Sequence, residues 1–453
     1  MKYFSKQYKG RNLRPPDLYE YFVDNFWFKT VDLENQEINE PLRGSHKADV
    51  VIIGGGYTGL SSAYNIKQKF PEKKIVLLEG ACCGYGASGR NGGFCISTSL
   101  LNWEETDSKC RQADMRVSTY GISQIKKMIL DYDVDCDFSE KGMVEVALNE
   151  KHIQGLEDYG QGLQKFGLES TLVTGSELEA KFKSPLFMAG LLMPFGATLN
   201  PAKLAREMKR VVEAIGVEVR ERSVVTRISP GKINHIDTEF GEIQAPILVV
   251  AVNAYAYKLG FFNNRAFPVT VHQIATEPLS QAQWASIGWQ NRQGLSDMRA
   301  MYSYSVPSKD GRIVMGGCDF TYYAQDALSS GNDKAVTKRI TNDLFSFFPQ
   351  LKGLQIEYAW SGTTAYTLGR IPSVGVMGDY KNIYYGLGFS EGVPSTQTAG
   401  RIIADLMAGE SNEFTSHFIV NRKIPYAGPK RLRSMFGKGV KWMMEKYEYS
   451  PIH

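Results

Sequence analysis

The stretch from Ala48 to Gly93 decides the fold, and it reads ADVVIIGGGYTGLSSAYNIKQKFPEKKIVLLEGACCGYGASGRNGG. An apolar, β-branched run from Val50 to Ile53 is typical of a buried parallel strand, and a helix is predicted from Thr58 to Lys69. A second strand, Lys74 to Leu78, ends at Glu79, where an acid can meet the ribose hydroxyls of an adenosine. Strand, glycine turn, helix and acid-ended strand in this order predict a dinucleotide site.

The glycine turn after the first strand fits G-x-G-x-x-G, with Gly54, Gly56 and Gly59. Gly54 permits the tight turn, Gly56 lets the backbone approach a pyrophosphate, and Gly59 lets the helix pack closely on the sheet. Tyr57 and Thr58 stand at the helix N-terminus, whose dipole faces the phosphates. Because glycine turns are common in loops, the prediction depends on the strands and the acid that flank this turn.

A second glycine-rich turn, GYGASGRNGG at 84–93, follows the acid-ended strand, and simple NAD-binding dehydrogenases have no comparable run there. The two turns together resemble FAD enzymes of the D-amino-acid oxidase superfamily, in the branch of the glycine, sarcosine and γ-glutamylputrescine oxidases. By this resemblance, the turn contacts a flavin through Gly86, Ala87, Ser88, Arg90, Asn91, Gly92 and Gly93. The competing interpretation of Arg90 and Asn91 is that they belong to an ordinary solvated turn.

The resemblance extends from Trp27 to Gly409 and includes TEPL at 276–279, GRIVMGG at 311–317 and YAWSGTTAYTLGRIPSVG at 358–375. It implies α/β and α+β architecture: a Rossmann-like FAD-binding domain of the glutathione-reductase type with an inserted antiparallel-sheet substrate domain. A third glycine turn opens a helix from Val393 to Met407 and aims its dipole at the flavin. Further cofactor contacts implied by the resemblance are Val225, Asn253, Gly388, Phe389, Ser390, Glu391, Gly392 and Val393.

The predicted domains are discontinuous, because the chain leaves the dinucleotide fold after the second glycine turn and returns twice. The expected order is an N-terminal arm at 1–45, an FAD-binding domain at 46–120, 198–262 and 356–425, a substrate domain at 121–197 and 263–355, and a basic amphipathic tail at 426–453. That tail could suit a membrane surface, and docking onto the body of the protein is the favoured alternative.

Position 364 has neither the cysteine nor the arginine that some members of this superfamily have there. Sarcosine oxidases resemble this segment but hold FAD through a cysteine at the position of Thr364, and no histidine lies between His46 and His152 for a histidyl link. FAD is therefore expected to bind noncovalently. Glycine oxidase and D-amino-acid oxidase place a carboxylate-binding arginine at the same position, and threonine cannot form that bidentate clamp. Unless another arginine such as Arg299 moves in, a simple α-amino acid is a poor substrate, and the segment resembles the γ-glutamylputrescine oxidases best.

Four residues are candidates for direct roles in catalysis: His272, Tyr304, Thr364 and Tyr366. A hydrogen-bonded histidine at a strand edge competes with the catalytic interpretation of His272, and core packing competes for the two tyrosines. The resemblance implies oxidation of a primary or secondary amine by hydride transfer to flavin N5. The imine is then hydrolysed to an aldehyde plus an amine or ammonia. A 2-hydroxy-acid oxidoreductase and a flavin-binding module without turnover are the alternative functions.

Composition limits the remaining possibilities. With 453 residues, of which 43% are hydrophobic, the chain can form two or three domains with substantial cores. A net charge of +4 from scattered residues gives no case for nucleic acid, and six cysteines without C-x-x-C spacing predict no metal site. No apolar run approaches the ~18 residues of a membrane span, so a cytoplasmic location is expected. Val314 stands where sarcosine oxidases have an oxygen-activating lysine, which leaves O2 or another electron acceptor open.

Overall fold

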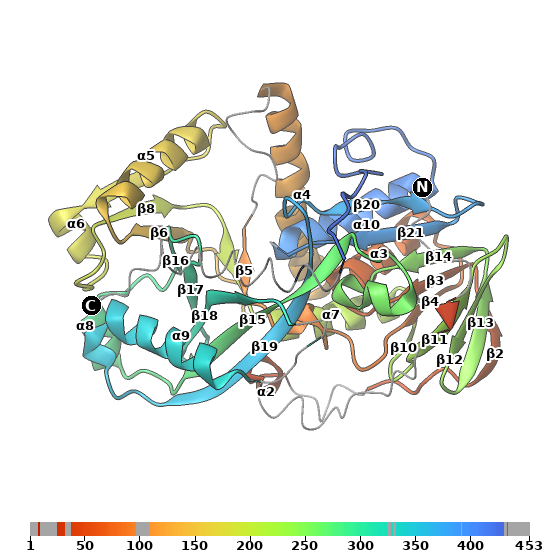
Figure 1. Ribbon diagram of the computed structural model, residues 1–453, viewed down its shortest axis with the longest axis horizontal. Coiled ribbons are helices and arrows are strands. Elements are labelled where there is room, and N and C mark those ends of the chain that lie inside the picture. Colours follow the sequence, from red (N-terminus) through yellow and green to blue (C-terminus); the bar gives the residue numbers. More distant parts are fainter. Residues whose placement is uncertain are drawn as a thin grey trace.

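The computed structural model describes residues 8–9, 25–31, 38–96, 108–323, 328, 332–390, 392–429 and 433 (Figure 1). Glu391 lies outside these residues, as do most of the predicted N-terminal arm and nearly all of the predicted C-terminal tail. No helix within the described ranges is both long enough and apolar enough to cross a membrane.

A mostly parallel sheet forms the dinucleotide half of the molecule, as predicted. Over the described residues its six strands follow the order β10 (Glu218–Arg220), β4 (Ile75–Leu78), β3 (Val50–Ile53), β14 (Ile247–Val250), β21 (Ile383–Leu387) and β20 (Ser373–Met377). The first five strands are parallel, and β20 runs antiparallel at the edge. The central strands are apolar over their whole length because both faces of the sheet are covered.

Alternate residues of β3 belong to different hydrophobic cores. Val50 and Ile52 pack in the core formed with three helices, whereas Val51 and Ile53 pack toward a second sheet. The helices are α3 (Tyr57–Lys69), α7 (Pro201–Ala214) and α10 (Val393–Met407). The second sheet, within the described ranges, has the order β1 (Tyr8–Lys9), β11 (Val225–Ser229), β12 (Asn234–Thr238), β13 (Gly241–Ala245) and β2 (Gly44–Lys47). The three layers are the helices, the parallel sheet and the second sheet. The carboxyl ends of the parallel strands all lie at one edge of the middle layer.

A larger, mainly antiparallel sheet occupies the left half of Figure 1. In the described part of the chain it has eight strands: β19 (Ile356–Thr367), β15 (Ala266–Thr276), β18 (Ile313–Thr321), β17 (Ser303–Pro307), β16 (Gly294–Asp297), β6 (Met143–Ala147), β8 (Ala189–Met193) and β7 (Thr171–Thr174). Helices α8 (Gln281–Ile287) and α9 (Lys334–Phe347) cover one face, and α5 (Glu150–Gln164) packs on β6 and β8. Although β19 falls inside the range assigned to the FAD-binding domain, it pairs along its length with β15.

The remaining elements connect the two halves. Helix α4 (Ser108–Tyr132) packs beside α10, and the short helix α2 (Phe26–Lys29) packs against α7 and β19. The rest are α6 (Gly175–Glu179), the paired strands β5 (Phe94–Cys95) and β9 (Ala197–Thr198), and the turns η1 (Ala87–Gly89), η2 (Asn253–Leu259) and η4 (Pro349–Leu351).

Candidate active site

A cavity of about 730 Å³ lies between the parallel sheet and the eight-stranded sheet. Its wall includes Glu79 and Val225 at the dinucleotide end, and Glu145 and Tyr159 in the other half of the molecule. Its volume is within the range of natural cofactor and ligand sites. The cavity joins the region predicted to bind FAD with the face of the substrate sheet.

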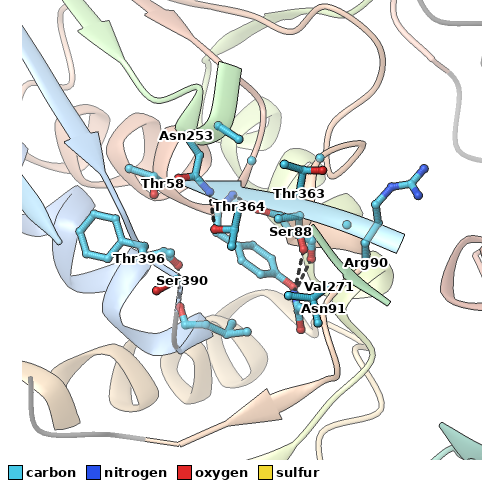
Figure 2. A pocket seen from close by; sticks show the side chains of 18 of the residues that line it. Thr58, Ser88, Arg90, Asn91, Asn253, Val271, Thr363, Thr364, Ser390 and Thr396 are labelled. Atoms are coloured by element: carbon cyan, nitrogen blue, oxygen red, sulfur yellow. Dashed lines mark hydrogen bonds between the residues drawn. The ribbon is translucent and has the colours of Figure 1, made fainter. Parts of the chain in front are cut away.

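The first glycine turn has the backbone that the motif predicts. Gly54 has a φ of +107°, and a Cβ atom there would stand 2.4 Å from the carbonyl oxygen of Ala251. A Cβ atom at Gly59 would stand 1.8 Å from the carbonyl oxygen of Gly54, so only glycine allows α3 this close to the turn. Gly59 therefore lies behind the cavity wall, whereas Gly56 lines the cavity. Thr58 also lines it, as Figure 2 shows. The N-terminus of α3 opens toward the space where a pyrophosphate would bind.

The carboxylate of Glu79 is oriented by two backbone groups. It accepts hydrogen bonds from the amide nitrogens of Gly55, at 2.6 Å, and of Ala81, at 2.9 Å. Burial raises the pKa of Glu79 to about 7. The buried carboxylate of Glu221 fixes the loop that follows by accepting a hydrogen bond from the amide nitrogen of Cys83, at 2.6 Å. Glu79 is thus held at the cavity wall, where the ribose of an adenosine would lie.

Hydrogen bonds of Asn91 stabilise the second glycine turn internally, and a hydrogen bond of Ser88 connects this turn to α3. Asn91 donates from Nδ2 to the carbonyl oxygen of Ser88, at 2.9 Å, and accepts at Oδ1 from the amide nitrogen of Gly93, at 2.9 Å (Figure 2). The hydroxyl oxygen of Ser88 accepts a hydrogen bond from the amide nitrogen of Tyr57, at 3.0 Å. These bonds give Asn91 a defined place in the turn, and the residue lines the cavity.

Arg90 is 2% exposed, which rules out the solvated-turn interpretation for this residue. Its guanidinium donates to the carbonyl oxygens of Tyr85, at 3.0 Å, and Ser361, at 2.8 Å. The carbonyl oxygen of Arg90 in turn accepts hydrogen bonds from the side chains of Gln273, at 2.8 Å, and Trp360, at 3.0 Å. Two strands of the eight-stranded sheet therefore hold the second glycine turn in place. Trp360 performs this task from outside the cavity lining.

The part of the N-terminal arm that the structure describes braces the same turn. The indole nitrogen of Trp27 donates to the carbonyl oxygen of Asn91, at 2.9 Å, and Nδ2 of Asn25 donates to the carbonyl oxygen of Gly89, at 3.1 Å. Both side chains are buried. The sequence predicts an arm at 1–45 but does not indicate this supporting role.

The space beside these turns is suited to a flat, polar-edged cofactor. A Cβ atom at Gly86 would meet no atom within 4 Å, so the backbone there faces open cavity. The N-termini of α3 and α10 both reach the cavity. The predicted contacts that line it are Gly54, Gly56, Tyr57, Thr58, Glu79, Gly86, Ala87, Ser88, Arg90, Asn91, Gly92, Val225, Asn253, Phe389, Ser390, Gly392 and Val393. Gly59, Gly93 and Gly388 stand behind the lining, and the last two have positive φ angles of +76° and +81°.

The eight-stranded sheet brings one row of side chains to the cavity. Ser296 lies opposite Glu145 and Tyr304, Tyr304 lies opposite Gly316, and Gly316 lies opposite Gln273. Directly opposed residues point to the same face of a sheet, and every member of this row with a side chain lines the cavity. A Cβ atom at Gly316 would stand 2.7 Å from Cζ of Tyr304, so glycine makes room for the ring.

The structure does not bring His272 into the cavity. It is 1% exposed and lies between Val271 and Gln273, which both line the cavity. Because successive residues of a strand point to opposite faces, His272 shares the face of Ile274, which packs in the core beneath α9. The prediction of a polar group over the flavin at this position is corrected accordingly.

Thr364 does line the cavity, and it lies 3.0 Å from a fixed partner. The amide nitrogen Nδ2 of Asn253 donates a hydrogen bond to its hydroxyl oxygen (Figure 2). Arg299 does not compensate for the missing arginine. Its guanidinium is paired with Asp297, at 2.7 Å, and with Asp343, at 2.8 Å, in a buried network away from the cavity lining. Position 364 therefore has a neutral hydrogen-bonding group and no guanidinium.

Sequence reasoning missed several residues that line the cavity: Tyr85, Glu145, Tyr159, Tyr255, Lys258, Phe320 and Arg370. One of them had a usable signal. Glu145 interrupts the apolar strand MVEVA, and an acid inside such a strand is unusual enough to suggest a function.

Residues 49–406 match the DAO family, described as FAD dependent oxidoreductase. The chain belongs to this family. It is 31% identical to gamma-glutamylputrescine oxidoreductase of Escherichia coli (strain K12) over 88% of this chain and 92% of that protein. It is 20% identical to glycine oxidase of Geobacillus kaustophilus over 85% and 99% of the two chains.

Solved structures share the family fold. The crystal structure of the G. kaustophilus glycine oxidase superposes with a TM-score of 0.73 at 18% identity, covering 84% of this chain and all of that chain. L-proline dehydrogenase from P. horikoshii gives a TM-score of 0.68 at 19% identity, covering 87% and 99%. Membership of the DAO family identifies FAD as the cofactor and the protein as an oxidoreductase, and the cavity lining contains the residues suited to holding that cofactor.

Proposed function

We propose that the protein oxidises a primary or secondary amine whose reacting carbon carries no carboxylate, giving an imine that water hydrolyses to an aldehyde and an amine or ammonia. The observation that carries this proposal is the neutral Thr364 in the cavity wall, with Arg299 bound elsewhere. The similarity to an E. coli gamma-glutamylputrescine oxidoreductase supports the same substrate class.

When bound, FAD supplies the acceptor for a hydride from the carbon next to nitrogen. The N-terminus of α3 with Gly56 would hold its pyrophosphate, and Glu79 its ribose. The second glycine turn would lie along the flavin. Both the turn and α3 are anchored by the bonds of Ser88 and Asn91, so the cofactor enters a site that is already shaped.

The amine must lose its proton before oxidation, because a protonated nitrogen has no lone pair to stabilise the developing cation. Tyr304 and Tyr366 line the cavity, and burial raises the pKa of both phenols. They therefore stay protonated at neutral pH and position the amine by hydrogen bonding. Phe195 and Phe320 add apolar wall, which lowers the pKa of an amine that enters and so favours its neutral form.

The 2-hydroxy-acid alternative needs a cation beside the reacting carbon to hold the carboxylate. Among the described residues that line the cavity, the cationic side chains are those of Arg90, Lys258 and Arg370. Arg90 extends away from Thr364 and is bonded to backbone carbonyls (Figure 2). Lys258 lies over the ring of Tyr255 in η2. Arg370 is exposed, its guanidinium lies 5.7 Å from the centre of the Tyr366 ring, and its side chain is hydrogen-bonded to Tyr302. The hydroxy-acid alternative would therefore use Arg370 to hold the carboxylate, whereas the neutral Thr364 favours the amine.

Anaerobic flavin reduction tests the proposal. The purified holoprotein is mixed without oxygen with butylamine, N-methylbutylamine, glycine, sarcosine, D-alanine or lactate, and the flavin absorbance is followed. Bleaching by an alkylamine with formation of butyraldehyde supports the proposal. Fastest bleaching by glycine, sarcosine or D-alanine overturns the substrate class, and bleaching by lactate alone supports the hydroxy-acid alternative.

A further inference from the structure

Glu145 is an acid in the substrate half of the cavity that the proposed chemistry does not use. It lies at the centre of β6, is partly buried and lines the cavity. Within the described ranges, no group donates a hydrogen bond to its carboxylate and no cation pairs with it. A buried carboxylate without a partner is costly, so its presence on the wall of a ligand cavity points to a ligand group that completes it.

The sheet register places Glu145 at a defined distance from the flavin turn. Glu145 lies opposite Ser296, which lies opposite Tyr304, and the ring of Tyr304 lies against Gly92 (strands β6, β16 and β17 in Figure 1). Two strand spacings separate Glu145 from Tyr304, which is about 10 Å between their backbones. At this distance Glu145 does not reach a reacting carbon beside Gly92. It can instead contact the end of a bound molecule that lies away from the reacting carbon.

The surroundings of Glu145 favour a cation. Burial and the neighbouring Asp297 raise the pKa of Glu145 to about 7. Burial raises the pKa of Tyr159, and the charge of Glu145 adds to this effect. Burial also raises the pKa of Tyr302, Arg370 acts against that rise, and Glu145 makes a smaller contribution in the same direction as burial. Asp297 is already neutralised by Arg299, so Glu145 is the acid that remains available. A positive group at Glu145 would stabilise its charged form, whereas an anion there would be repelled by it.

We propose that Glu145 binds a second, positively charged nitrogen of the substrate, so that the protein prefers diamines or polyamine-like chains over monoamines. This inference rests on the proposed amine oxidation, because it assigns the two ends of one molecule. The reacting nitrogen lies near Tyr304, the second nitrogen meets Glu145, and methylene groups span the distance between them. Met143, Met193 and Phe195 supply apolar wall for such a chain.

The test compares molecules of one length with different ends: hexylamine, hexamethylenediamine and ε-aminocaproate. Anaerobic reduction of the holoprotein gives an apparent Kd and a limiting rate for each. The wild-type protein is expected to bind the diamine about tenfold more tightly than hexylamine, and ε-aminocaproate more weakly than hexylamine. In Glu145→Gln the diamine preference is expected to fall to about unity, with the change in apparent Kd rather than in the limiting rate. Glu179→Gln, on the exposed end of α6, removes the same charge elsewhere and is expected to keep the preference.

Two further results separate this inference from the proposed function. If hexylamine bleaches the flavin and the diamine binds no better, or if Glu145→Gln keeps the diamine preference, the inference is overturned while the amine oxidation stands. If no amine bleaches the flavin, the proposed function fails. Calorimetric binding of hexamethylenediamine to the oxidised holoprotein then decides: binding lost in Glu145→Gln supports the cation site, and no binding to the wild-type protein overturns it.

Discussion

The ring of Tyr304 lies on the backbone of Gly92, so closely that a Cβ atom at position 92 would stand 2.4 Å from Cε2 of the ring. The ring also meets Phe94 edge to face, with centroids 5.6 Å apart. At this contact the eight-stranded sheet meets the glycine turn that we expect to hold the flavin. The contact between the Tyr304 ring and Gly92 therefore couples the position of the cofactor to the shape of the substrate cavity.

The contact predicts a specific effect of Gly92→Ala. The added methyl group must displace either the Tyr304 ring or the turn, and overpacking of this kind is expected to raise the Kd for FAD about tenfold or more. Kd is measured by titrating apoprotein with FAD and following quenching of flavin fluorescence. In a Tyr304→Ala background the same substitution is expected to have little effect, because the obstructing ring is gone. Equal effects in both backgrounds would contradict the contact.

Glu79→Ala is expected to weaken FAD binding by about 1.5–3 kcal/mol, the usual range for hydrogen bonds to a charged group. The variant loses the hydrogen bonds to the ribose. It also loses the hydrogen bonds by which the wild-type carboxylate holds the amide groups of Gly55 and Ala81. Glu72→Ala, an exposed acid just before β4, is the matched control. Unchanged FAD affinity in Glu79→Ala would overturn the placement of the adenosine.

All of the FAD is expected to leave the protein on acid or heat precipitation. Thr364 cannot form a thioether, and no histidine lies between positions 46 and 152. Flavin fluorescence is measured in the supernatant and on the washed, denatured polypeptide. Fluorescence that stays with the polypeptide would show a covalent link and contradict noncovalent binding.

The stability of the apoprotein should depend on pH through Glu145. The folded state raises its pKa from an ordinary 4.5 to about 7, so over this window the unfolded chain loses a proton that the folded chain keeps. Stability is therefore lost as pH rises, and Glu145→Gln removes the loss. Urea unfolding should show the free energy of unfolding of Glu145→Gln rising relative to wild type, by up to about 3 kcal/mol, between about pH 5 and pH 8. Glu179→Gln should follow the wild-type curve, and a parallel curve for Glu145→Gln would contradict the buried, unpaired carboxylate.

The dinucleotide half could be predicted from sequence because its determinants are local. The turn at Gly54 and the acid at Glu79 are separated by one helix and one strand, and α10 begins and ends where the pattern predicts. The substrate half depends on register. Glu145, Ser296 and Tyr304 become neighbours only when three distant strands align. His272 was misplaced for a related reason: both faces of β15 are largely buried, so alternation alone does not tell which face meets the cavity.

The most direct test of the central claim is anaerobic reduction of the wild-type holoprotein by butylamine and by glycine, compared with Thr364→Ala. Our account predicts that butylamine bleaches the flavin and yields an aldehyde, and that glycine and sarcosine reduce it poorly, because the cavity wall at Thr364 has no guanidinium for their carboxylate. If glycine or sarcosine is the fastest reductant and Thr364→Ala changes nothing, the carboxylate is held elsewhere and the account of this site is wrong.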